Sequence, residues 1–266
     1  MDSWRAVCIT QFIMVFIINA FTLVVFARSR HLRRRNTYLI MNLTVADLLI
    51  AAVSGPETIL FFIPNKRPKK GFWVLYLIFS DMCWIASLGN LVLISLEWLH
   101  STLYPFRHCL VGKSVYYKII IYSWFAALTL ACGLQISRLN DIPLADRYPW
   151  IIYICLTLAV LTTSYVIIVS AERKLSVTLF IVSAASILTL LPWVITICIS
   201  INSDRYLWIK FTSMKIASTF YHLNSILNPV IYVIRLTEFR RASKELFCKN
   251  TSYPVRRDQP IGLKAM

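Results

Sequence analysis

Seven long apolar runs divide this chain of 266 residues, and they constrain its fold more than any other feature. Each run approaches or exceeds the roughly 20 residues that an α-helix needs to cross the hydrocarbon core of a bilayer. An open β-sheet would leave backbone polar groups unsatisfied in hydrocarbon, so each run is expected to form a helix. The predicted spans are Ala6–Ala27, Thr37–Phe62, Phe72–Leu99, Val115–Leu134, Tyr148–Val169, Leu175–Ile201 and Trp208–Ile234.

The composition agrees with an all-α integral membrane protein. Hydrophobic residues make up 58% of the chain and charged residues 15%, and the mean hydropathy is +0.65. Ordinary soluble domains contain about 45–50% apolar and about 25% charged residues. A soluble enzyme is therefore excluded, and the sequence carries no metal, nucleophile or phosphate-loop motif that would indicate catalysis. The first run lacks a small-residue cleavage site after its apolar core, so it is expected to be retained as a span.

The basic residues predict the orientation of the chain. Five of them lie between Arg28 and Arg35, and eight lie from Arg235 onward. Connections rich in Lys and Arg stay on the cytoplasmic side, which predicts an N-terminus outside and a C-terminus inside. The basic residues between Lys66 and Lys70 are the exception, because they would lie outside. The net charge of +16 then indicates attraction to anionic membrane lipid, at about 1 kcal/mol per residue, rather than to nucleic acid.

A carboxylate near the middle of the second predicted span needs polar partners, because an ionisable group inside a span is costly. Asp47 has no basic residue in its own span. In the seventh span two asparagines and a serine recur at spacings of three and four and so share one helical face. Their oxygens suit a small hard cation or a water cluster, and the alternative is polar packing that ties helices together. The candidate set is Asp47, Ser87, Asn224, Ser225 and Asn228.

Two prolines and a C-terminal amphipathic stretch complete the organisation. Pro192 and Pro229 each remove a backbone hydrogen bond within a span and predict kinks. After the seventh span, RLTEFRRASKELF predicts a helix lying in the membrane interface. Cys248 follows it and is a candidate for palmitoylation, or otherwise an unmodified thiol. We expect residues 1–248 to form the membrane domain and residues 249–266 a cytoplasmic tail.

Several residues, taken together and in their order along the seven predicted spans, resemble those of a rhodopsin-like, class A G-protein-coupled receptor. The resemblance implies a seven-helix bundle in the plasma membrane, an outer ligand pocket and an inner face that binds a heterotrimeric G protein. It also implies that the set around Asp47 is a sodium pocket and that Tyr165 and Tyr232 rearrange on activation. The matching residues are Asn19, NLTVADLL around Asp47, Ser87, ISLE ending at Glu97, Trp124, Tyr165, Pro192 within LLPW, and NPVIY from Asn228 to Tyr232.

The inner end of the third span departs from that family. Glu97 matches the family's acid, but Trp98 occupies the position of the arginine that the acid usually holds. Glu172 matches a second acid that often binds the same arginine, so we expect Arg107 or Arg173 to pair with these acids instead. A functioning transducer is the main interpretation, and a silent or modulatory protein with the receptor fold is the alternative. A small ion transporter is less consistent, because the chain shows no internal repeat.

Other departures concern the outer half. Trp73 stands where the family has a disulfide cysteine, and Thr157 stands where it has a proline, which is similar to the melanocortin, lysophospholipid, cannabinoid and adenosine branch. The acids of the outer polar set favour a cationic or peptide ligand, whereas the basic residues from Lys66 to Lys70 favour an anion. Ordinary helix packing is the alternative for the aromatic members. The candidate ligand-binding residues are Glu57, Ser80, Asp81, Trp84, Tyr221 and His222.

Overall fold

The computed structural model describes residues 2–29, 32, 37–61, 70–140, 142, 148–171, 176–202, 216, 219–220, 222–231 and 237–247, and within them no strand occurs. Residues 222–231 form a helical segment inside the seventh predicted span. The named helices are α1 (Asp2–Arg28), α2 (Thr37–Phe61), α3 (Lys70–Leu103), α4 (Pro105–Leu110), α5 (Lys113–Leu139), α6 (Tyr148–Ala171), α7 (Ser176–Asn202) and α9 (Thr237–Phe247).

Long apolar helices confirm the predicted all-α membrane bundle. Helices α1, α2, α3, α5 and α6 are long and apolar enough to cross a membrane, and the described apolar stretch of α7 is Ala184–Thr196. Six predicted spans therefore coincide with long helices, and the seventh is described mainly over residues 222–231. Helix α6 ends at Ala171, α7 begins at Ser176, and the two helices contact each other, so the fifth and sixth predicted spans are separate neighbouring helices.

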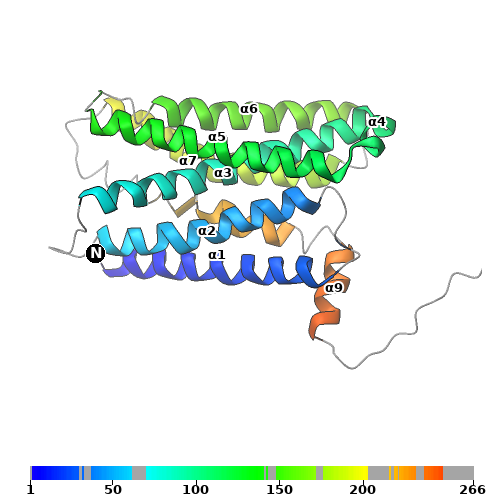
Figure 1. Ribbon diagram of the computed structural model, residues 1–266, viewed down its shortest axis with the longest axis horizontal. Helices are drawn as coiled ribbons and strands as arrows, with labels where there is room; N and C mark the ends of the chain where they lie inside the picture. The colour runs from blue at the N-terminus through cyan, green and yellow to red at the C-terminus, as the bar shows by residue number, and fades with distance from the viewer. Residues whose placement is uncertain are drawn as a thin grey trace, which may run out of the picture.

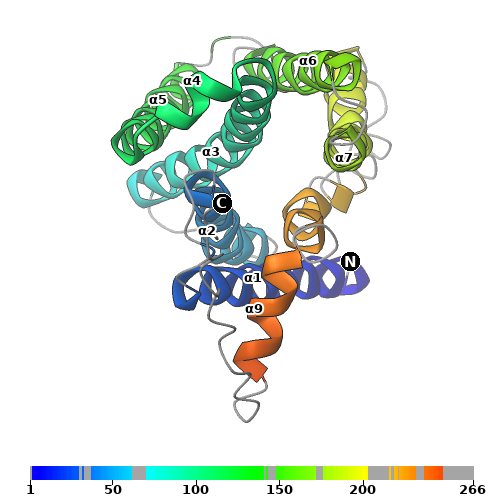
Figure 2. The same ribbon diagram turned by 90° about the vertical axis from the view of Figure 1, so that its right-hand side faces the viewer.

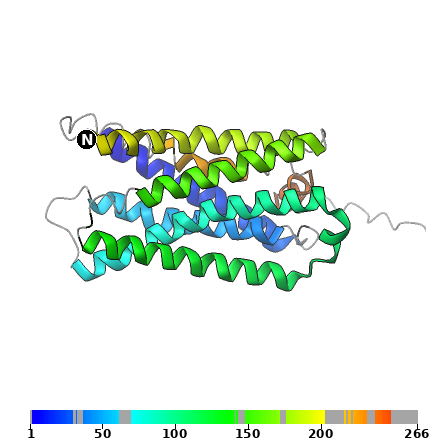
Figure 3. The ribbon, with the colours of Figure 1, turned by 90° about the horizontal axis from the view of Figure 1, so that it is seen from above.

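The long helices lie side by side along the long dimension of the molecule (Figure 1). Seen end-on they form a ring, with α5 packed on the outside of α3 (Figure 2), and the view from above shows the same neighbours (Figure 3). Helix α3 contacts α2, α4, α5 and α6, which makes it the central helix of the bundle. We call the end at which α1 begins the outer end, following the predicted orientation, and the opposite end the inner end.

Helix α9 is the predicted amphipathic helix, and it packs across the inner end of α1 (Figure 1). Phe239 and Ala242 are fully buried, and the ring of Phe239 lies 5.1 Å from that of Phe26 on α1. Arg240 and Arg241 are exposed on the opposite face. The helix thus buries an apolar stripe while its basic residues stay in contact with the solvent or with lipid headgroups.

A polar chain ties the three helices α2, α3 and α5 together. The Asn42 amide donates to Asn90 Oδ1 at 2.6 Å, and Trp124 donates its indole N–H to Asn42 Oδ1 at 2.9 Å. Asn90 also donates to the Ala86 carbonyl on its own helix. Buried amides need such partners because water is absent from the hydrocarbon. The tryptophan predicted to mark the fourth span therefore fixes α5 against α2.

Close packing of α3 against α6 depends on a glycine. Tyr153 on α6 donates its hydroxyl hydrogen to the Ile85 carbonyl on α3 at 2.7 Å. A Cβ atom added at Gly89, one turn further along α3, would lie 3.2 Å from that hydroxyl oxygen. The tyrosine is held by its hydrogen bond, so a methyl group at Gly89 would have to displace this hydroxyl by a few tenths of an ångström and strain the bond. A Cβ atom at Gly133 on α5 would meet nothing within 4 Å.

Alanine at these two glycines should have different effects on stability. Replacing a helical glycine by alanine gains about 1 kcal/mol of helix propensity, and we expect Gly133→Ala to show this gain. Overpacking costs about 1–3 kcal/mol, so Gly89→Ala should melt below Gly133→Ala and at or below the native chain. Tryptophan fluorescence during heating of the purified protein in detergent measures both. Equal gains in the two variants would contradict the close contact at Gly89.

Candidate functional site

A buried carboxylate forms a polar centre in the middle of the bundle. Asp47 on α2 is fully buried, and its Oδ1 accepts hydrogen bonds from Ser87 on α3 at 2.7 Å and from Ser225 at 2.9 Å. Its Oδ2 accepts a hydrogen bond from the amide of Asn228 at 3.0 Å. Four of the five residues predicted to lie together are therefore in direct contact, and they join α2, α3 and the segment 222–231.

The polar centre extends to α1 and α7 through the same segment. The fifth predicted residue, Asn224, accepts a hydrogen bond from Thr189 on α7 at 3.3 Å. Asn19 on α1 donates to the Ser225 carbonyl at 3.1 Å. Its Oδ1 atom is buried without a hydrogen-bond partner among the described residues. An acceptor oxygen next to the carboxylate-binding serine adds to the oxygen-rich environment that a small hard cation or a water molecule would complete.

The outer polar residues divide into two groups. Ser80 is buried and shares a 2.8 Å hydrogen bond with Ser54 on α2. His222 is buried between two rings, 4.6 Å from Phe12 on α1 and 5.2 Å from Trp84 on α3. Its Nδ1 atom has no hydrogen-bond partner in the described part of the chain. This group lies inside the bundle, where it can contact a ligand.

The acid next to Ser80 instead faces α5. Asp81 Oδ2 accepts hydrogen bonds from Arg138 and from Gln135, each at 2.8 Å. The arginine neutralises the carboxylate, so Asp81 does not add net negative charge to a ligand site, and this corrects the argument that it favours a cationic ligand. The side chain of Glu57 and the whole of Tyr221 lie outside the described residues.

At the inner end, the acid of the third span has a different partner from the one expected. Glu97 Oε1 lies 2.9 Å from His108 Nε2 on α4 and accepts a hydrogen bond from the Tyr116 hydroxyl on α5 at 3.3 Å. The expectation that Arg107 pairs with Glu97 is wrong, because the guanidinium of Arg107 lies 5.9 Å from the ring centre of Tyr104, and His108 and Tyr116 bind the acid instead. The pairing of His108 with Glu97 was not predicted from the sequence.

The remaining switch residues are only partly described. Trp98 is partly buried, and its indole packs against the largest apolar cluster of the bundle. Tyr165 and Pro192 are partly buried, and Pro229 is buried next to Asn228. Their predicted roles in activation stay predictions. Glu172, Arg173, Tyr232 and Cys248 lie outside the described residues.

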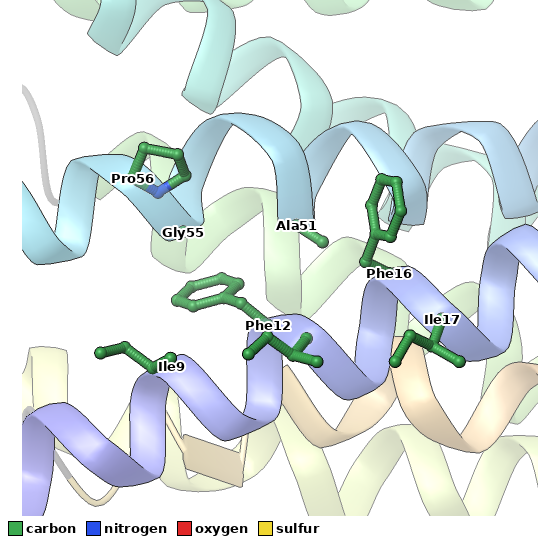
Figure 4. Close-up of a pocket in the computed structure, with 8 residues that line it drawn as sticks. Ile9, Phe12, Phe16, Ile17, Ala51, Gly55 and Pro56 are labelled. Atoms are coloured by element: carbon green, nitrogen blue, oxygen red, sulfur yellow. The ribbon is translucent and has the colours of Figure 1, made fainter.

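An apolar groove of about 260 Å³ opens between α1 and α2 near the outer end (Figure 4). Its walls include Ile9, Phe12 and Phe16 of α1, and Ala51, Gly55 and Pro56 of α2. The absence of a side chain at Gly55 leaves room for the Phe12 ring, which a Cβ atom would approach to 3.2 Å. The groove is smaller than the roughly 300–1,000 Å³ of typical ligand pockets, and its walls offer no charged group, so we do not assign it to the ligand.

Comparison with known proteins agrees with this architecture. Residues 18–142 match the family described as 7 transmembrane receptor (rhodopsin family). The matched part contains the residues from Asn19 to Trp124 that carry the resemblance, so this part of the chain is similar to rhodopsin-like, class A receptors, as predicted. Members of this family are receptors and not enzymes.

One similar protein is the histamine H4 receptor of Mus musculus. The chain is 33% identical to it over 79 residues, which are 30% of this chain and 20% of that receptor. The chain thus matches about a fifth of the length of this relative. Placement in the melanocortin, lysophospholipid, cannabinoid and adenosine branch stays a prediction.

The ion pair between Asp81 and Arg138 should contribute measurably to stability. Hydrogen bonds to charged groups contribute about 1.5–3 kcal/mol, so Arg138→Ala should lower the free energy of unfolding by about that amount. Asp81→Ala combined with Arg138→Ala should cost less than the sum of the two single changes. Arg240→Ala, on the exposed face of α9, is the matched control for loss of an arginine. Thermal unfolding of the purified variants measures these differences, and strictly additive losses would show that the two side chains do not interact.

Proposed function

We propose that this chain is a cell-surface receptor of the plasma membrane that binds an extracellular ligand and signals through heterotrimeric G proteins. Its N-terminus lies outside and its C-terminus lies in the cytoplasm. The observation that carries the proposal is the Asp47 centre. Ser225 and Asn228, which bind the carboxylate, belong to the same ten-residue segment as His222 in the outer half. A ligand that displaces His222 would therefore act on the contacts of Asp47.

The ligand is proposed to contact Ser80, Trp84 and His222. The unpartnered Nδ1 atom of His222 offers a hydrogen bond, and Trp84 offers an aromatic face. The mouse relative is named for histamine, which is a small amine. In this chain Ser80 stands at the position where amine receptors carry an aspartate, and Asp81 is bound by Arg138. These contacts favour recognition by hydrogen bonding and stacking over recognition of a cation.

The G protein is proposed to bind at the inner end, on a surface that includes α4. Phe106 is 88% exposed and Leu110 is 84% exposed, and their spacing of four places them on one face of this short helix. Arg107 between them is also exposed. Large apolar side chains that are exposed outside the hydrocarbon mark a surface that binds a protein partner or a membrane.

A receptor-fold protein that does not signal is the second candidate, and Trp98 is the observation that favours it. The indole packs against the apolar core instead of presenting a positive charge to the inner end. An apolar residue at this position removes the cation that, by resemblance, engages the G protein.

Restoring the arginine distinguishes these two candidates. We expect cells that express the native chain to show basal second-messenger signalling above untransfected cells, and Trp98→Arg to give no more than the native chain at matched surface density. The reason is that the proposed G-protein surface, with Phe106 and Leu110 exposed, is present in the native chain and does not include residue 98. If cells signal when they express Trp98→Arg and not when they express the native chain, the native chain is the receptor-fold protein that does not signal. A panel of reporters for the different G-protein classes makes the measurement.

The same centre is proposed to bind a sodium ion, with Asp47, Ser87, Asn224, Ser225 and Asn228 as its candidate ligands. A bound cation would supply the positive charge that this buried carboxylate lacks among its described partners. Sodium chloride should raise the melting temperature of the purified native chain relative to choline chloride at equal ionic strength, because binding to the folded state alone is stabilising. Asp47→Asn keeps an acceptor oxygen for the hydroxyls of Ser87 and Ser225 but removes the negative charge. It should abolish the difference in melting temperature between sodium chloride and choline chloride. An equal response of both chains would leave the centre as polar packing.

A further inference from the structure

Two amide side chains of α1 bind this helix to the seventh predicted span. Gln11 donates its amide N–H to the Thr219 carbonyl at 3.3 Å, and Asn19 donates to the Ser225 carbonyl at 3.1 Å. A carbonyl can only accept, so in both contacts the amide nitrogen faces the carbonyl and the side-chain oxygen is left for another partner. Both side chains are buried, and both oxygens, Gln11 Oε1 and Asn19 Oδ1, have no hydrogen-bond partner among the described residues.

The Asp47 centre accounts for the oxygen of Asn19 but not for that of Gln11. Asn19 lies beside Ser225, which binds Asp47. Gln11 precedes Asn19 by eight residues on α1 and so lies about two turns nearer the outer end. The carbonyl that it reaches, at residue 219, comes about one helical turn before His222. His222 Nδ1 is the other buried atom in this outer region that lacks a hydrogen-bond partner within the described part of the chain.

Aromatic rings surround His222 next to Gln11. Phe12, the neighbour of Gln11 in the sequence, has its ring 4.6 Å from that of His222, and Trp84 lies 5.2 Å away. Phe12 also contacts α2, where Gly55 leaves room for its ring (Figure 4). None of these side chains carries a permanent charge. The surroundings therefore favour a neutral molecule that stacks on an aromatic face and forms hydrogen bonds.

The unpaired oxygen of Gln11 destabilises the ligand-free protein. A buried acceptor without a donor has lost its hydrogen bond to water and gained none in return. A methionine of similar length would avoid this cost in an apolar surrounding. Binding sites commonly contain such groups because the ligand completes their hydrogen bonds, and they reduce stability in its absence.

We propose that Gln11 is a specificity-determining residue of the ligand site, and that the ligand is a small neutral aromatic molecule with an N–H or O–H donor. The donor bonds to Gln11 Oε1, and the ring packs against Trp84 and His222. Because Gln11 Oε1 can only accept, a ligand without a donor leaves it unpaired. This inference rests on the proposed function, since it names the class of ligand for the contacts proposed there and adds a residue of α1 to them.

Benzamide and acetophenone are suitable probes, because they have the same shape and an NH2 group in the first replaces a methyl group in the second. A compound that binds the folded state alone raises the melting temperature, so thermal unfolding of the purified full-length chain in lipid nanodiscs measures binding. The native chain should need at least about tenfold less benzamide than acetophenone for the same rise, because a site with a buried acceptor rejects an analogue without the donor. In Gln11→Met the two concentrations should be about equal.

Gln135→Met is the matched control for the loss of a buried glutamine, because Gln135 is 2% exposed and donates to Asp81. It should keep the native preference for benzamide. Without any compound it should melt below the native chain, because Asp81 loses a donor. Gln11→Met should melt at or above the native chain, because it removes an acceptor that has no partner.

The outcomes separate this inference from the proposed signalling. An equal response of the native chain to both compounds, or a preference that persists in Gln11→Met, would overturn the role of Gln11. A native chain that responds to neither compound would also overturn it, because water alone then satisfies the oxygen. If Gln11→Met melts as far below the native chain as Gln135→Met does, Gln11 is only a structural residue. A preference that Gln11→Met abolishes, in a chain that gives no second-messenger response, would support the binding role and reject the proposed signalling.

Discussion

The buried carboxylate of Asp47 is the constraint on which the arrangement of the helices depends. A charge or a polar group in the hydrocarbon is tolerated only when the protein supplies partners. Among the described residues, the hydrogen-bond partners of Asp47 come from other elements: one hydroxyl from α3, and one hydroxyl and one amide from the segment 222–231. The apolar faces of the helices would pack almost as well in several rotations, since lipid is as apolar as the helices are. The hydrogen bonds of Asp47 therefore fix how α2, α3 and the segment 222–231 are rotated about their own axes.

The acids near the two ends of α3, Asp81 and Glu97, have different kinds of partner. At the outer end the acid of α3, Asp81, is neutralised by Arg138 of α5, which is a permanent cation. At the inner end Glu97 is bound by the imidazole of His108 and by a tyrosine hydroxyl, neither of which is a permanent charge. The first contact fixes two spans that pack closely in any case. The second restrains a short helix in which no residue is buried.

The sequence predicted the polar centre because its members carry a local signal. Ser225 and Asn228 are three residues apart on one helix, and Asp47 lies inside an apolar run, where a carboxylate stands out. The contacts of Asp81 and Glu97 carried no such signal. Arg138 is 57 residues from Asp81, and His108 lies in a connection that the hydropathy pattern did not identify as helical. The proline at the start of α4 was the available cue, since proline is favoured in the first turn of a helix. Which face of α3 meets α5 depends on packing of whole helices, and no spacing within one span reveals it.

The segment 222–231 joins the outer polar residues to the Asp47 centre within one structural unit. His222 packs against Phe12 and Trp84, Asn224 bonds to α7, and Ser225 and Asn228 bond to Asp47. Pro229 follows Asn228 directly and removes one backbone hydrogen bond from the segment. The side chains that contact Phe12 and Trp84 and those that bind Asp47 belong to one helical backbone, so a rotation of the segment cannot change one set of contacts and keep the other. A rotation of the segment would therefore change the contacts of His222 in the outer half and those of Asp47 in the middle of the bundle at the same time.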